Sequence, residues 1–154
     1  MGIKPEFGSG VILAKVEAFQ RNLDKAVLFM LKYLGEDLAK YAKEQHNYTD
    51  QTGNLTNSIG YAVVRNKEIV YYGGTNQPGV GADAALETAM KYAQDMQDTY
   101  SLIIVAGMNY ATYVEAKGYN VILPAELKAK KDFPAAMNRL MEKAKSKANE
   151  LFGI

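Results

Sequence analysis

The feature that most constrains the fold is a series of apolar residues spaced three and four positions apart between Val11 and about Gln45. These residues are Ile12, Val16, Phe19, Leu23, Val27, Met30, Leu34, Leu38 and Tyr41. Such spacing places them on one face of an α-helix, with charged residues on the opposite face. At 1.5 Å per residue the helix would be roughly 50 Å long, which exceeds one side of a compact domain of this size. The sequence therefore predicts that part of the helix projects or bends.

Gly35 lies inside this helical pattern, where glycine costs about 1 kcal/mol relative to alanine. It predicts either a break in the helix or a close backbone contact. Core packing accounts for most of the apolar stripe, and any surplus length needs a partner subunit.

Length and composition restrict the class of protein. The chain has 154 residues, 48% of them hydrophobic and 23% charged, which suits one soluble domain with a single core. Its net charge of +1 argues against a dedicated nucleic-acid-binding protein. It has no cysteine, which excludes disulfides, zinc-thiolate sites and thiol nucleophiles. No apolar run is long enough to span a membrane. We expect residues 1–10 to form a flexible arm and residues 11–154 a single domain.

The hydrophobic period changes from helical to extended at Asp50–Ile59. Thr52-Gly53-Asn54 has the residues of a turn, because glycine can adopt positive φ and the Asn side chain can bond nearby backbone. Beyond it the pattern predicts strands at 55–64 and 68–72, joined as a hairpin, and a helix at 82–97 in an excursion spanning 73–97.

The second half of the chain alternates short elements. The pattern predicts a central strand at 102–106, a short helix at 110–118 closed by Gly118, a last strand at 119–123, and a C-terminal helix opened by Phe133-Pro134. The expected fold class is α+β, with a long N-terminal helix and a small, mainly antiparallel sheet of about four strands with flanking helices.

A glycine-rich segment connects the hairpin to the middle helix. It contains Gly73, Gly74, Pro78, Gly79 and Gly81. It lacks the Gly-Lys-Ser/Thr ending of a phosphate-binding loop and the Rossmann glycine spacing. We therefore expect a surface loop, and we hypothesise that it forms an interface and orders only on assembly.

Two motifs occur in a distinctive order. The first includes Thr52, Gly53, Leu55, Ser58 and Ile59, and the second includes Tyr110, Ala111, Tyr113, Val114 and Glu115. Together they resemble the tail-completion, or head-to-tail joining, family of long-tailed double-stranded DNA phages and prophages. The resemblance implies a long helix leading into the first motif, followed by a small sheet with flanking helices. Thr56 and Ala116-Lys117-Gly118 depart from the family pattern, which has Arg after the Leu and Gly-Thr after the Tyr-Val-Glu.

The resemblance implies a structural virion protein of the neck or upper tail, present in the host cytoplasm during assembly. Its partners would be further copies in a ring, often a hexamer, and neighbouring neck or tail proteins, with nonspecific contact to phage DNA in the lumen. It implies no catalysis, cofactor or metal. A ring needs two different contact patches on each subunit, and the overlong first helix and the 73–97 excursion are the candidates.

Two other classes of function remain as alternatives. An enzyme would need His46, the only histidine, to work with Ser58 or Ser101 and with Asp37 or Asp50, but their spacing supports no triad. A nucleic-acid-binding module would show salt-dependent retention on heparin. Glu115, the one carboxylate in a sharp motif, is expected to accept structural hydrogen bonds.

Overall fold

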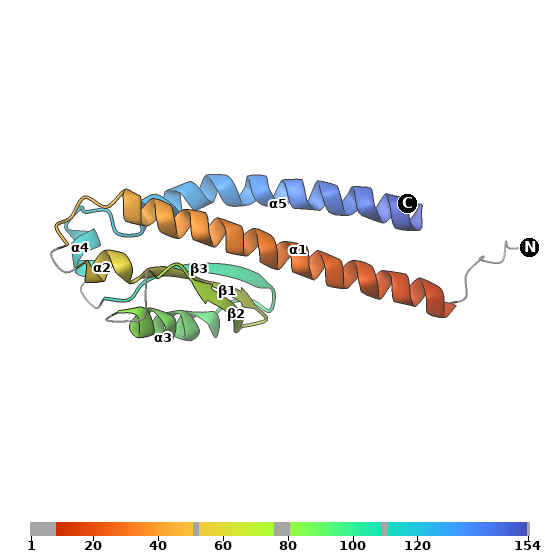
Figure 1. The fold of residues 1–154 in the computed structure, drawn as a ribbon, viewed down its shortest axis with the longest axis horizontal. Coiled ribbons are helices and arrows are strands. Elements are labelled where there is room, and N and C mark those ends of the chain that lie inside the picture. Colours follow the sequence, from red (N-terminus) through yellow and green to blue (C-terminus); the bar gives the residue numbers. More distant parts are fainter. Residues whose placement is uncertain (1–8, 51–52, 76–80, 109–110, 154) are drawn as a thin grey trace, which may run out of the picture.

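The computed structural model describes residues 9–50, 53–75, 81–108 and 111–153, which form an α+β fold (Figure 1). The elements in chain order are α1 (Ser9–Glu44), α2 (Asn54–Asn57), β1 (Ile59–Arg65), β2 (Glu68–Gly73), α3 (Ala82–Ala93), β3 (Tyr100–Ala106), α4 (Ala111–Ala116) and α5 (Leu123–Phe152). The predicted fold class is confirmed. The helix α1 begins at Ser9, so residues 9 and 10 are helical instead of belonging to the predicted arm, and the rest of that arm lies outside the described residues.

The described strands form one antiparallel sheet with the order β2-β1-β3. The predicted hairpin is confirmed, and Asn66 and Lys67 at its turn both have positive φ, of 52° and 69°. Two left-handed residues suit the right-handed twist of the strands that they join. The strand at 102–106 was predicted to be central, which is wrong, because β1 is the central strand and β3 lies at an edge.

The two faces of the sheet are covered by different helices (Figure 1). Alternation along β1 directs Ile59, Tyr61 and Val63 into the larger core with α1 and α5, and Ala62 into the smaller core under α3. The helix α3 approaches the sheet through small side chains, namely Ala82, Ala85, Ala89 and Ala93. Leu86 and Met90, predicted to be on its buried face, are half-buried and exposed respectively.

The helices α1 and α5 pack together as an antiparallel pair and extend beyond the sheet (Figure 1). The first turns of α1 contain no fully buried side chain, whereas Val27, Leu31, Leu34 and Leu38 lie in the core. The predicted projection is therefore confirmed, but α5 of the same chain covers one side of it. At the far end Phe19 and Phe152 meet edge to face, with ring centroids 5.9 Å apart.

Gly35 does not break α1 but permits a close contact. A Cβ at this position would lie 2.2 Å from the ring of Tyr61, which is only 1% exposed. The glycine therefore lets the helix backbone lie directly on the central strand, as one of the two predictions for this position stated.

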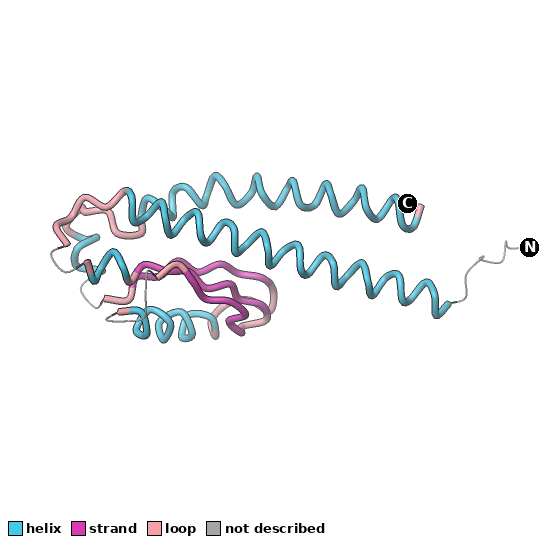
Figure 2. Tube along the Cα trace, viewed as in Figure 1, coloured by secondary structure: helices cyan, strands magenta, loops and turns pink. Residues whose placement is uncertain are grey.

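Two predicted elements at the loop end of the molecule are wrong (Figure 2). Leu55, predicted to be in a strand, belongs to the single helical turn α2. Residues 119–123, predicted to be a strand, form the connection from α4 to α5, and so the described sheet has three strands instead of four. Val121 is nevertheless fully buried in the larger core.

The C-terminal helix begins ten residues earlier than predicted. Pro124, and not Pro134, occupies the first turn of α5, and Pro134 lies within the helix. Pro134 is exposed. Solvent can therefore satisfy the carbonyl group that loses its helical hydrogen bond to the missing N–H of proline.

Within the described ranges, none of the helices is long and apolar enough to cross a membrane.

Candidate assembly surfaces

The two sequence motifs meet in one packed corner at the loop end of the sheet. Leu55 and Ile59 from the first motif are buried in the same core as Ala111 from the second, and Val114 packs against this core. Residues more than 50 positions apart in sequence therefore support one another through apolar burial.

Ser58 joins the first motif to the end of β3. Its side chain is fully buried, and its hydroxyl donates to the Leu55 carbonyl oxygen at 2.7 Å. The same oxygen accepts the Gly107 N–H at 3.1 Å. Both hydrogen-bonding roles of the hydroxyl are thus used in the fold, which explains why the corner contains a serine at this position.

Backbone geometry explains the rest of the first motif. Gly53 has φ +75°, as predicted for the turn, and precedes α2. The carboxylate of Asp50 accepts the Thr56 N–H at 2.8 Å and so satisfies a donor of this short helix. Thr52 lies outside the described residues.

Glu115, in the second motif, caps the N-terminus of α5. Its carboxylate accepts the backbone N–H groups of Val121 at 2.6 Å, Ile122 at 3.2 Å and Leu123 at 2.7 Å. These donors would otherwise have no helical partner, and negative charge is favourable at a helix N-terminus. The prediction of a structural role for Glu115 is confirmed. Tyr110 lies outside the described residues, as does the side chain of Tyr113.

The described glycines of the 73–81 segment lie in close contacts within the fold. Gly73 ends β2, and a Cβ there would lie 3.2 Å from the Tyr61 hydroxyl oxygen. Gly74 has φ +89°, and its carbonyl oxygen accepts a hydrogen bond from the Lys43 ammonium group. Gly81 has φ +90° and would place a Cβ 2.7 Å from the Cβ of Ser58. Pro78 and Gly79 lie outside the described residues, so the interface hypothesis for this loop stays a prediction.

Polar contacts fix the position of α1 against the sheet and against α5. Asp24 of α1 accepts a hydrogen bond from the Tyr100 hydroxyl and pairs with Arg65 at 2.7 Å. The Tyr100 hydrogen bond and the Arg65 guanidinium lower the pKa of the Asp24 carboxyl group. Lys128 of α5 pairs with Asp37 of α1 at 2.8 Å, and it also hydrogen-bonds Asp132 within its own helix. These carboxylates raise the pKa of Lys128.

Four of the five candidate residues for the alternative catalytic triad make other contacts, and the fifth, Ser101, lies in β3. His46 lies just beyond α1, with Nδ1 2.5 Å from the Lys43 carbonyl oxygen, and its ring contacts Tyr48. Asp37 and Asp50 make the contacts described above, and the Ser58 hydroxyl is buried within the corner. Among the residues that the structure describes, no cluster of three or more His, Asp or Glu side chains could hold a metal ion.

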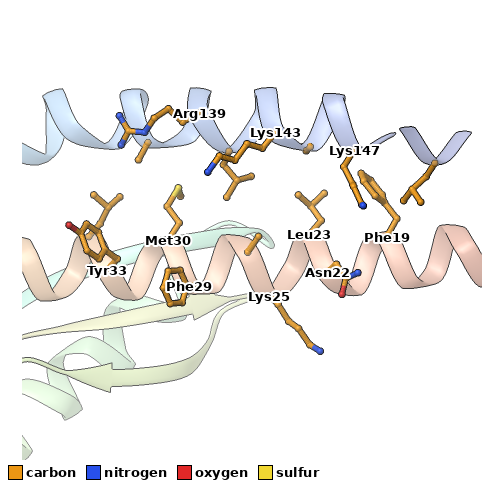
Figure 3. A pocket seen from close by; sticks show the side chains of 16 residues that line it. Phe19, Asn22, Leu23, Lys25, Phe29, Met30, Tyr33, Arg139, Lys143 and Lys147 are labelled. Carbon is orange, nitrogen blue, oxygen red and sulfur yellow. The ribbon is translucent and has the colours of Figure 1, made fainter. Parts of the chain in front are cut away.

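A groove of about 860 Å³ runs between α1 and α5 (Figure 3). Its apolar lining includes Leu23 and Met30 from α1 and Leu140 from α5. Phe29 and Tyr33, one turn apart on α1, lie at its edge and are 73% and 69% exposed. Four basic side chains line the groove, and none of its lining residues is acidic. The complete lining is Phe19, Asn22, Leu23, Lys25, Ala26, Phe29, Met30, Tyr33, Leu34, Ala136, Arg139, Leu140, Lys143, Ala144, Lys147 and Leu151.

In the sequence, Arg139, Lys143 and Lys147 lie outside the apolar stripe of the C-terminal helix, and Phe29 and Tyr33 belong to none of the predicted sites. A signal was present, because both aromatic residues lie outside the regular apolar stripe of α1. Large apolar side chains in such positions indicate a second, unfilled contact surface.

Comparison with known proteins finds no matching family model and no curated protein or solved structure with significant similarity.

Proposed function

We propose that this chain is a structural virion protein of a phage or prophage. In this proposal it is a ring-forming tail-completion or head–tail joining component at the neck or upper tail, and it acts by oligomeric assembly. The proposal starts from the resemblance carried by the two sequence motifs.

The observation that carries the proposal is the corner where the motifs meet. Ser58 and Glu115 are the polar residues of the motifs that chemistry would most readily use, yet both are engaged with backbone groups of the fold. The described motif residues thus build the scaffold. Among the described residues the two most exposed aromatic side chains, Phe29 and Tyr33, lie elsewhere, on α1, which suits a protein that acts through contacts with other subunits.

The proposal is tested by deleting the gene and examining the particles by electron microscopy. Loss of a joining component should leave filled heads and separate tails, because each assembles independently until the connection is completed. Supply of the protein in trans should restore joined particles. Mass spectrometry of purified wild-type particles should detect the chain.

Genomic context provides a second test. Portal, major capsid, tail-tube and tape-measure genes should flank the gene. Intact infectious particles from the deletion strain, or metabolic genes on both sides, would contradict the proposal and return attention to an enzymatic or nucleic-acid-binding role.

A further inference from the structure

The groove between α1 and α5 has the properties of a protein-binding surface. Phe29 and Tyr33 are exposed on adjacent turns of α1, and Leu23 and Met30 line the space beside them. Exposed aromatic residues next to an apolar depression are typical anchors of protein interfaces. The groove spans Phe19 to Leu34 along α1, which is roughly 22 Å at 1.5 Å per residue.

The charge at the groove selects its partner. Lys25 lies on the α1 side, and Arg139 and Lys143 lie on the α5 side (Figure 3). A symmetric contact between two grooves would bring these like charges together, and it is therefore disfavoured. The groove requires a partner surface with acidic side chains around an apolar centre.

The chain itself carries such a surface on α3. Helix α3 carries two acidic residues, Asp83 and Glu87, and one basic residue, Lys91, whereas α5 carries seven basic and four acidic residues. Asp83, Glu87 and Met90 recur at helical spacing on the outer face of α3, and all three are exposed, Met90 by 55%. With 12 residues, α3 is about 18 Å long, which fits within the length of the groove.

The two surfaces cannot meet within one molecule. The helix α3 packs on one face of the sheet, whereas α1 and α5 cover the other (Figure 1). A contact between them must join two copies through different patches. Such a head-to-tail contact repeats from copy to copy and produces a ring when the rotation closes.

We propose that helix α3 of one copy docks in the α1–α5 groove of the next. Met90 packs against Phe29 and Tyr33, while Asp83 and Glu87 face the basic residues at the groove. The inference deepens the proposed function and rests on it for closure into a ring. It names the surfaces that join neighbouring subunits.

Disulfide trapping tests the contact directly, because the natural chain has no cysteine. Ala26→Cys places one thiol in the groove, and Met90→Cys places one on α3. Mixed at high concentration and low ionic strength under mild oxidation, the two variants should form mixed dimers severalfold more than either forms dimers alone. This preference should decline with added NaCl, because salt screens the charges.

Glu142→Cys is the matched control, because Glu142 is exposed on α5 and does not line the groove. Its mixture with Met90→Cys should give only statistical cross-linking. Statistical yields for the Ala26→Cys and Met90→Cys pair as well would overturn the proposed contact.

A charge exchange provides a test that needs no cysteine. Arg139→Glu/Lys143→Glu and Asp83→Lys/Glu87→Lys should each reduce self-association in sedimentation velocity, because each brings like charges together. Mixing the two variants, or combining all four substitutions in one chain, should restore it. Lys131→Glu/Lys145→Glu is the control, since it makes the same change in net charge outside the groove. Equal effects of control and groove variants, or failure of the exchange to restore association, would overturn the proposal.

The outcomes separate this inference from the proposed function. Specific cross-links in a protein absent from virions would leave the contact valid and the virion role wrong. Virions that contain the two cysteine variants but lack their cross-link would support the virion role and overturn the proposed contact. Statistical cross-links together with DNA retention that Arg139→Glu/Lys143→Glu abolishes would assign the groove to nucleic acid.

Discussion

The Glu115 carboxylate caps the N-terminus of α5, and the structure indicates how much free energy of unfolding this cap contributes. Ile122 at the N-cap position makes no side-chain capping hydrogen bond, so the Glu115 carboxylate supplies that function from α4. Loss of a helix cap costs about 1 kcal/mol. Loss of the acceptor for the Val121 N–H adds about 1–3 kcal/mol to this cost, because Val121 is fully buried.

Glu115→Ala should therefore lower the free energy of unfolding by about 2–4 kcal/mol. Glu115→Gln should cost about half as much, because it keeps one acceptor oxygen but removes the charge and places an amide NH₂ among donors. The assay is urea denaturation followed by circular dichroism at 222 nm, with the free energy and the m-value fitted for each variant.

Glu126→Gln provides the matched control. Glu126 also lies in the first turn of α5, but its side chain is 61% exposed and makes only an i, i+4 pair with Lys130. The control should cost less than about 0.5 kcal/mol. If Glu115→Ala costs no more than Glu126→Gln, the carboxylate does not cap the helix and the reasoning is refuted.

The remaining predictions concern packing and electrostatics. Gly35→Ala should destabilise the fold by about 1–3 kcal/mol in thermal unfolding, because its Cβ would overlap an immobile aromatic ring, whereas Gly10→Ala, with nothing within 4 Å, should be neutral or slightly stabilising. Equal effects of the two would contradict the contact. Leu55→Asp should lower the melting temperature strongly, because Leu55 is 1% exposed and the new carboxylate would be buried without a partner; an unchanged melting temperature would remove Leu55 from the core. The lowered pKa of Asp24 adds stability above the ordinary Asp pKa of 3.8, and this stability is lost as the pH falls through the lower folded value. Asp24→Asn should therefore cost about 1 kcal/mol at neutral pH and much less at low pH in urea titrations; a cost that does not depend on pH would assign the effect to packing.

Local chemistry allowed several parts of the fold to be predicted from sequence alone. The three-and-four spacing located α1 to within about two residues at each end. Asn66 at the hairpin, Gly53 at the corner and Gly118 after α4 mark turns, and all three have the positive φ expected there. These features depend on residues close in sequence, whose conformational preferences act before any distant contact forms.

Tertiary contacts decided the elements that were predicted wrongly. Both Pro124 and Pro134 suit the first turn of a helix, and the carboxylate of Glu115 determines which of them begins α5. The same carboxylate accepts three consecutive N–H groups, whereas successive N–H groups of a strand point in opposite directions. That geometry excludes the predicted strand at 119–123, although the apolar character of Val121 correctly indicated burial.

The candidate assembly surface likewise depends partly on the sequence and partly on the tertiary structure. Sequence alone determined that Phe29 and Tyr33 lie outside the main stripe of α1 and that basic residues concentrate toward the end of the chain. Only the packing of α5 along α1 places Arg139 and Lys143 beside the aromatic pair. The physical reason is that a helix can be inferred from its own periodicity, whereas the groove between two helices exists only after burial of apolar surface has brought distant segments together.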